Sequence, residues 1–348
     1  MTDMLYTITL NPALDYVLSA HTAGNDPACR ADNAAFLPGG KGINVSLMLR
    51  RLGVPSVPAG ICAGTAGRCL LDKLEQAGLA PDFVHLHPDA ATDAGTRINI
   101  KLRETHPDGT SVLREINTAG CTVTPDALEE LAARLSRRLQ PCDRIVLAGS
   151  IPPGLGSGAY VRLLTLLRPD AAKAADTYAG KPPVSFAADT AGAGMASLLP
   201  LHPWLIKPNR AELAELSGMD ISDSRAAVRA ARLLQAAGAR HVLVTLGADG
   251  MLLVPARAAE SDGLGDCCLQ TDAIPGRALS SAGAGDASLA GFLAAYLRGW
   301  KPEKALRYAA ACGAAAAFSA GGMGSRADTD RLYALSALTV PEVRRLPL

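Results

Sequence analysis

The sequence predicts an α/β fold in which helices cover a mostly parallel sheet and a small β element is inserted. From about residue 120 onward, short β-branched runs alternate with amphipathic helical stretches, which is the pattern of parallel strands joined by crossover helices. Before that point, residues 96–103 alternate between apolar and polar side chains, as a strand with two different faces does. The first pattern indicates the main body, and the second indicates the insert.

Strands and helices can be placed in the main body. Thr124 is a predicted N-cap with Pro125 at the first helical position, and Gly238 is expected to end a helix that begins near Ser224. The candidate strands are residues 144–148, 184–188, 204–207 and 241–245. A parallel sheet with helical connections is therefore the expected body.

The insert is expected to be a small β sheet. Residues 96–103 have one apolar and one basic face, and a turn signal at 106–109 leads to a second run at 112–116, which predicts an antiparallel hairpin. Further short extended stretches lie within residues 15–37. The expected organisation is a single domain over residues 1–348, with a lid formed by about 12–38 and 95–118.

Charge and composition favour a protein that acts on small molecules. The 348 residues carry a formal net charge of +1, so we expect no basic surface of the kind that nucleic acid or an anionic membrane attracts. The first residues lack the basic start and long apolar stretch of a secretory signal. The longest run of small apolar residues, 308–321, is shorter than the roughly 20 residues that span a bilayer. We expect a cytoplasmic protein without nucleic-acid or membrane partners.

A glycine-rich loop leads directly into a helical pattern near the C-terminal end. Gly283, Ala284 and Gly285 precede Asp286, and apolar side chains then recur at helical spacing. Free N–H groups and the positive end of the helix dipole make such a junction an anion site, and glycine lets a phosphate approach the backbone closely. Asp286 could accept a proton from an attacking hydroxyl there. The alternative is that Asp286 only caps the helix.

A second glycine-rich loop also precedes a helical pattern. It is not a Walker A loop, because Lys41 is followed by Gly42 and not by Ser or Thr. Gly39 and Gly40 permit close approach of a ligand, and Asn44 offers both a donor and an acceptor for sugar hydroxyls. A tight strand-to-helix turn without a ligand is the alternative.

A third motif follows the predicted strand that ends at Lys207. Pro208 ends this strand, and a helix follows it. Asn209 and Glu212 lie three residues apart and therefore share one face of the first helical turn, where an amide and a carboxylate oxygen could hold water around Mg²⁺. Ordinary helix capping explains the same spacing. Both interpretations stay open at the level of sequence.

These motifs, in this order, resemble the ribokinase-like (PfkB) sugar kinases, and in particular their phosphofructokinase and tagatose-6-phosphate kinase branch. The resemblance runs from residues 7–15 (TITLNPALD) to the glycines near Gly321, almost the whole chain. It implies a ribokinase-like three-layer α/β/α sandwich with a central, mostly parallel sheet and a small β-sheet lid. It also implies a homodimer, because the lid strands of this family pair between subunits.

The resemblance implies a catalytic centre beside a nucleotide site. Asp286 is the expected base, next to an anion hole formed by Gly283, Ala284 and Gly285. Asn209 and Glu212 are expected to act on Mg²⁺ through water. ATP and Mg²⁺ are therefore the expected cofactors, and K⁺ is a further candidate. The residues expected around the nucleotide are Lys207, Asn209, Thr245, Gly247, Gly250, Gly283 and Gly285.

The resemblance also implies a sugar-phosphate site. A phosphate already present on the sugar is expected near Arg97, Lys41 and Ser150. The strand pattern supports this expectation, since Arg97 and Lys101 lie on one polar strand face and a phosphate requires such cations. A solvated lid surface with ordinary charges is the alternative. The expected substrate residues are Asp15, Arg30, Gly39, Gly40, Lys41, Asn44, Arg97, Asn99, Lys101 and Ser150.

The expected reaction is ATP-dependent phosphorylation of fructose 1-phosphate to fructose 1,6-bisphosphate. Residues 96–102 are very similar to the matching strand of 1-phosphofructokinase, whereas Ala28 replaces a lysine of the family's minor 6-phosphofructokinase. Ser281 and Ala282 replace the usual Thr-Val pair before the anion hole. The alternatives are tagatose 6-phosphate or fructose 6-phosphate as acceptor, and a non-catalytic sugar-phosphate sensor on the same fold.

Overall fold

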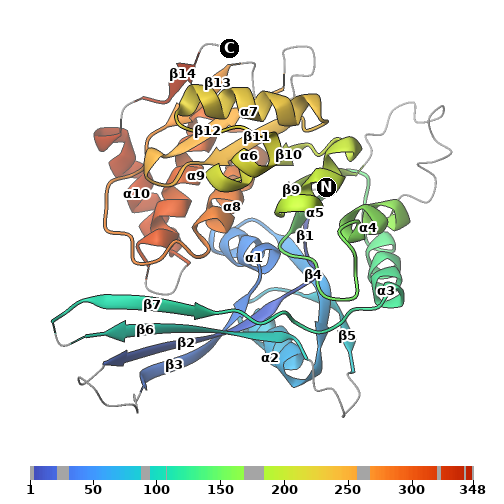
Figure 1. Cartoon of the computed structure of the whole chain (residues 1–348). Coiled ribbons are helices and arrows are strands. Elements are labelled where there is room, and N and C mark those ends of the chain that lie inside the picture. Colours follow the sequence, from blue (N-terminus) through green and yellow to red (C-terminus); the bar gives the residue numbers. More distant parts are fainter. Residues whose placement is uncertain are drawn as a thin grey trace, which may run out of the picture.

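Two sheets organise the chain, and Figure 1 shows the smaller one extending away from a body in which helices flank the larger one. The computed structural model describes residues 4–21, 31–87, 95–106, 108–167, 184–256, 267–319, 323–340 and 342–346. Arg30, Ala28 and Gly321, which the sequence singled out, lie outside these described residues.

The large sheet has ten strands and is mostly parallel. Its strands are β1 (Leu5–Thr9), β4 (Ser56–Ala63), β5 (Asp82–Leu86), β8 (Arg144–Ala148), β9 (Ser185–Asp189), β10 (Leu205–Ile206), β11 (His241–Thr245), β12 (Met251–Val254), β13 (Cys268–Thr271) and β14 (Arg344–Leu346). Their order is β14-β13-β12-β11-β10-β9-β8-β1-β4-β5. Strands from β11 to β5 run parallel, whereas β12, β13 and β14 extend one edge in antiparallel fashion. The carboxyl ends of the parallel strands therefore all lie along the same end of the sheet, which is its carboxyl edge.

Helices cover both faces of this sheet. They are α1 (Lys41–Arg51), α2 (Gly64–Gln76), α3 (Pro125–Ser136), α4 (Ala159–Leu167), α5 (Gly192–Leu198), α6 (Arg210–Ser217), α7 (Ser224–Ala236), α8 (Ala284–Leu297), α9 (Pro302–Ala317) and α10 (Arg326–Thr339). In β8, Leu147 belongs to the hydrophobic core that includes residues of α3, α4 and α7, whereas Val146 and Ala148 belong to the core that includes residues of α1, α8 and α9. This alternation produces the three-layer α/β/α arrangement that the sequence predicted. Among the described residues, no helix is long and apolar enough to cross a bilayer.

The second sheet is the predicted β insert. Its strands are β2 (Ala13–His21), β3 (Ala31–Gly39), β6 (Arg97–Thr105) and β7 (Ser111–Ile116), in the order β3-β2-β6-β7. Strands β6 and β7 form the predicted antiparallel hairpin, and β2 pairs antiparallel with β3 and parallel with β6. Within the range 15–37, where short extended stretches are expected, the described residues belong to β2 and β3, whereas residues 22–30, around Gly24 and Pro27, lie outside the described residues. That this sheet acts as a lid stays a prediction.

The predicted strands and caps of the body agree with the structure, apart from small differences. Residues 144–148 and 241–245 coincide with β8 and β11, whereas 204–207 is reduced to β10. Extended pairing nevertheless continues on both sides of β10, since the Trp204 N–H donates to Phe186 at 2.8 Å and the Lys207 N–H to Ala188 at 3.0 Å. Thr124 is the N-cap of α3, but in this fully described helix its side chain makes no capping hydrogen bond.

Candidate active site

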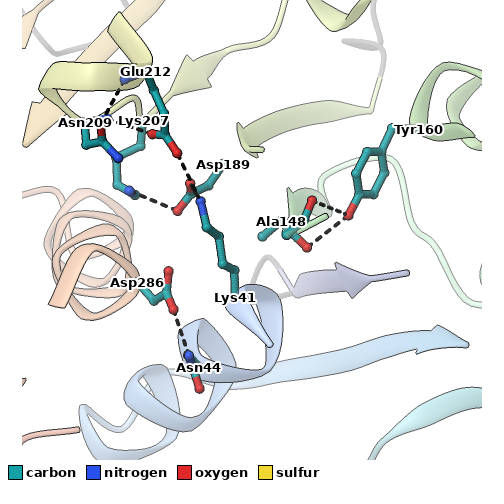
Figure 2. A network of polar contacts seen from close by, with 10 residues as sticks. Lys41, Asn44, Ala148, Tyr160, Asp189, Lys207, Asn209, Glu212 and Asp286 are labelled. Atoms are coloured by element: carbon teal, nitrogen blue, oxygen red, sulfur yellow. Dashed lines mark hydrogen bonds and ion pairs between the residues drawn. The ribbon is translucent and has the colours of Figure 1, made fainter. Parts of the chain in front are cut away.

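Polar side chains from distant parts of the chain meet at the carboxyl edge of the parallel strands (Figure 2). Asp189 ends β9, and Lys207 and Asn209 follow β10. Lys41 and Asn44 lie in the first turn of α1. In open α/β sheets this edge is where ligands bind. The structure therefore brings together residues of the second glycine-rich loop and of the motif that follows Lys207, and Asp286 of the first glycine-rich loop contacts Asn44.

The glycine-rich loop opens directly into α8, as the sequence predicted. Gly283 is the N-cap and has a φ of 76°, in the left-handed region that favours glycine. A Cβ on Gly285 would lie 3.0 Å from the Nζ of Lys207, so glycine leaves room beside that ammonium. The first-turn N–H groups of a helix lack partners within the helix and carry a partial positive charge. This junction therefore has the geometry of an anion site.

Asp286 lies in the first turn of α8 and is only 6% exposed. Its Oδ2 accepts a hydrogen bond of 2.8 Å from the Nδ2 of Asn44 on α1, which distinguishes it from a simple helix cap. Burial, followed by the negative charge of Asp189, raises the pKa of Asp286 to about 6, against the opposing effects of Lys207, Asn44 and Lys41. The carboxylate is therefore ionised at neutral pH, and its pKa is close to the value that suits a general base.

A network of four charged side chains adjoins this carboxylate. The Nζ atoms of Lys41 and Lys207 lie 2.9 and 3.0 Å from the two oxygens of Asp189, whose side chain is fully buried. Burial acts to raise the pKa of Asp189, but the charges of Lys207 and Lys41 outweigh it and lower this pKa. Burial likewise acts to lower the pKa of Lys41, but Asp189 and Glu212 outweigh it and raise this pKa. Asp189 and Lys41 are therefore both charged at neutral pH.

Asn209 and Glu212 form a capping box at the start of α6. The N–H of Glu212 donates to the Oδ1 of Asn209 at 2.9 Å, and the N–H of Asn209 donates to the Oε2 of Glu212 at 2.8 Å. The capping interpretation of this motif is therefore confirmed. The other carboxylate oxygen, Oε1, lies 3.6 Å from the Nζ of Lys41, inside the polar network. A role in Mg²⁺ binding stays a prediction.

The turn expected to hold the nucleotide adjoins the same edge. Thr245 ends β11 and forms an isolated parallel bridge with Asn209. Gly247 and Gly250 have φ values of 64° and 84° in the connection to β12. A Cβ on Gly250 would lie 2.0 Å from the carbonyl oxygen of Thr271, so this turn requires glycine.

The expected sugar residues of the second sheet surround one carboxylate. The Oδ2 of Asp15 lies 2.6 Å from the Nζ of Lys101, and its Oδ1 accepts a hydrogen bond of 2.9 Å from the Nδ2 of Asn99. A Cβ on Gly39 would lie 2.8 Å from the same carboxylate. Within the described residues, the buried Oδ1 of Asn99 has no hydrogen-bond partner. Asp15 is thus held by two polar contacts with no room for a side chain at Gly39, and one buried acceptor lies beside it.

The residues expected around the sugar's phosphate are linked through Asn11. The side chain of Arg97 donates to the carbonyl of Asn11 at 3.1 Å, and the Nδ2 of Asn11 donates to the Oγ of Ser150 at 3.2 Å. A cavity of about 480 Å³ has Ser150, Lys41 and Glu212 in its wall. The hydrogen bonds through Asn11 therefore link Arg97 of the second sheet to Ser150, and Ser150 lines the cavity together with Lys41 and Glu212 of the polar network.

Sequence reasoning missed two residues of the site. Asp189 directly follows the predicted strand 184–188, and an acid at the carboxyl end of a parallel strand was a usable signal. Tyr160 is fully buried on α4, and its hydroxyl donates to the carbonyl oxygens of Ala148 at 3.0 Å and Gly149 at 3.3 Å (Figure 2). It holds the end of β8 just before the Ser150 turn, and no local pattern in the sequence indicated this contact.

The fold and the site together define a small-molecule kinase of the three-layer α/β/α class. A glycine-lined helix start beside one buried carboxylate provides the positioning and charge that phosphoryl transfer requires. Residues 8–329 match the model of the pfkB family carbohydrate kinases, so the chain belongs to this family. The family predicted from the sequence is confirmed, and with it an ATP-dependent carbohydrate kinase activity.

Several known proteins are similar over nearly their whole length. The 1-phosphofructokinase of Bacillus subtilis is 31% identical over 316 residues, which cover 91% of this chain and 93% of the relative. The D-tagatose-1-phosphate kinase of Klebsiella oxytoca is 30% identical over 91% of this chain and 94% of the relative. The structure of phosphofructokinase-2 from Escherichia coli in complex with potassium has a TM-score of 0.80 at 24% identity, covering 97% of this chain and 100% of that one. This last likeness supports the fold alone.

Proposed function

We propose that this kinase transfers the γ-phosphoryl group of ATP to the free primary hydroxyl of fructose 1-phosphate, giving fructose 1,6-bisphosphate. The observation that carries the proposal is the hydrogen bond between Asp286 and Asn44 at 2.8 Å. It joins α8, whose N-terminal end is expected to face the nucleotide, to α1, whose N-terminal end is expected to face the sugar. The relative named 1-phosphofructokinase supports the choice of acceptor.

Asp286 acts as the base in this proposal. Phosphoryl transfer depends mainly on positioning and on charge stabilisation, so the carboxylate takes the proton of the attacking hydroxyl late in the reaction. Asn44 holds Oδ2, which leaves Oδ1 as the proton acceptor. The first-turn N–H groups of α8, including those of Gly285 and Asp286, stabilise negative charge on the transferring group.

The sugar is expected to bind between the second sheet and α1. Its hydroxyls meet Asp15 and the buried Oδ1 of Asn99, an acceptor that is costly to leave unsatisfied. Its existing phosphate lies toward Arg97, Lys41 and Ser150, with Lys101 on the same strand face as Arg97, and Arg30 remains part of the proposed set. The cavity beside Ser150 offers space for such a group.

The donor set also suits Mg²⁺, which typically binds proteins through one or two carboxylates and completes its shell with water and substrate phosphates. The described part of the chain holds no cluster of three His, Cys, Asp or Glu side chains placed to hold a metal. Asp189 and Glu212 nevertheless converge on one cation, the ammonium of Lys41, which supports a cation site at this point. Asn209 and Glu212 would hold the ion through water, where it supplies positive charge to the phosphates. K⁺ remains a further candidate, as the resemblance in the sequence implies.

A coupled ADP-release assay tests the proposed activity. We expect fructose 1-phosphate to have the highest kcat/KM among fructose 1-phosphate, fructose 6-phosphate, tagatose 1-phosphate and tagatose 6-phosphate. A higher value for another sugar phosphate would reassign the acceptor. Binding without any ADP release would instead indicate a sugar-phosphate sensor, a function for which the base and the capping-box carboxylate would be unnecessary.

We also propose a cytoplasmic homodimer that forms through the second sheet. Tyr16 pairs with Phe36 and Ile100, and Ile100 pairs with Ile116, so these side chains form one apolar row on the face opposite Asp15. Phe36 is 37% and Ile116 58% exposed, and contiguous exposed apolar side chains mark interaction surfaces. The variant Ile116→Asp should elute as a monomer in size-exclusion chromatography with light scattering. A monomeric wild type would refute the dimer.

A further inference from the structure

The ammonium of Lys41 lies between two carboxylates. Its Nζ is 2.9 Å from Asp189 and 3.6 Å from Glu212, although the sequence predicts a role for Lys41 at the phosphate of the sugar. Both carboxylates face this ammonium, and Glu212 belongs to the motif that is expected to act on Mg²⁺. A lysine ammonium therefore occupies the point on which two potential cation-binding carboxylates converge.

The two lysines of this network differ in their freedom to move. The side chain of Lys207 is 4% exposed, pairs with Asp189 and lies against Gly285. The side chain of Lys41 is 35% exposed and lines the cavity that also contains Ser150. Lys41 can therefore exchange its carboxylate partners for phosphate oxygens in that cavity, whereas Lys207 is held in place.

We propose that Lys41 is an internal counter-ion that holds Asp189 and Glu212 together until a divalent cation binds, and that its ammonium then moves to the phosphate of the sugar. The inference rests on the proposed function, since it takes the sugar-phosphate site from there. It makes Lys41 a positioning residue that couples binding of the metal ion to binding of the acceptor.

Charge balance provides the physical reason. Two carboxylates and two ammonium groups give these four side chains no net charge, and Asp286 adds a further negative charge nearby. A divalent cation is attracted only weakly while Lys41 remains, because the ammonium repels it and competes for the same oxygens. A phosphate that attracts the ammonium of Lys41 draws it away from the two carboxylates. Once the ammonium has left, these carboxylates bind the metal ion more tightly. By thermodynamic linkage, each ligand then strengthens the binding of the other.

Calorimetric titration of Mn²⁺ into the nucleotide-free protein tests the competition. Lys41→Met should bind Mn²⁺ about tenfold more tightly than the wild type, because the competing ammonium is gone. Lys41→Arg keeps the charge and should bind like the wild type. The matched control Lys304→Met removes a positive charge from an exposed position on α9 and should leave the affinity unchanged. Thermal melting verifies that each variant is folded, and Lys41→Gln replaces Lys41→Met if the latter does not fold.

A second titration tests the exchange. Fructose 1-phosphate should tighten Mn²⁺ binding to the wild type by about tenfold, and this coupling should be strongly reduced in Lys41→Met. Equal Mn²⁺ affinity in the wild type and Lys41→Met, including no binding to either, would overturn the proposal. Equal coupling in both proteins would overturn the movement toward phosphate. If fructose 1-phosphate fails to bind at all, the proposed acceptor is wrong, while the first titration still decides the competition.

Discussion

Replacing Asp286 with asparagine should make the protein more stable and nearly inactive at the same time. Burial and Asp189 raise the pKa of Asp286 from 3.8 to about 6. Because each pKa unit corresponds to about 1.4 kcal/mol, keeping this carboxylate ionised near pH 7 lowers the free energy of unfolding by up to about 3 kcal/mol. Asparagine has the same shape, can still accept the hydrogen bond from Asn44 and carries no charge. We therefore expect Asp286→Asn to stabilise the fold by about 1–3 kcal/mol near pH 7.

This stabilisation should depend on pH in a defined direction. The pKa of Asp286 is raised in the folded state, so the folded protein binds more protons than the unfolded chain between about pH 4 and 6. The contribution of this group to stability is therefore complete below pH 4 and is lost as the pH rises through about 6. Asparagine does not titrate, so the advantage of the variant should shrink toward zero near pH 4.

Urea unfolding of the wild type and Asp286→Asn at several pH values measures this difference, and the ADP-release assay measures activity. Turnover of the variant should fall by roughly 10²–10⁴, the usual loss for a general base. The kcat/KM of the wild type should fall below about pH 6 as Asp286 becomes protonated. Asp286→Ala is the control, since it loses the charge together with the hydrogen bond to Asn44. A variant no more stable than the wild type near pH 7, or wild-type activity that persists unchanged to pH 5, would refute the reasoning.

Three further changes test other parts of the site. Gly39→Ala should raise the KM for the sugar about tenfold while leaving that for ATP unchanged, because the new Cβ would lie 2.8 Å from Asp15 and displace it; an equal effect on both KM values would contradict this. Asp189→Asn should lower the free energy of unfolding by about 3 kcal/mol in urea, since the buried Lys207 loses its anionic partner; unchanged stability would mean that water replaces that partner. Lys101→Met should raise the KM for the sugar, because Asp15 loses its ion pair while keeping the hydrogen bond from Asn99; normal kinetics would show that the ion pair is dispensable.

The amino-acid sequence determined the features of this protein that depend on near neighbours. The β-branched runs, the helix starts and stops and the glycine loop before Asp286 all depend on short-range periodicity and backbone freedom. The capping box of Asn209 and Glu212 is equally local, because three residues separate its partners. Motif order was sufficient to identify the family, since it reflects the chain's linear arrangement and requires no knowledge of contacts.

Only the tertiary structure decided which side chains meet. Asn44 and Asp286 are 242 residues apart, and Lys41 and Asp189 are 148 residues apart. Their contacts depend on the order of the strands in the sheet, which brings the ends of β9 and β10 beside the starts of α1 and α8. The partner of the Lys41 ammonium could not be predicted for the same reason. A flexible cation binds whichever anions the fold places within its reach, and the acid nearest to it, Asp189, comes from a strand whose position in the sheet is set by long-range packing.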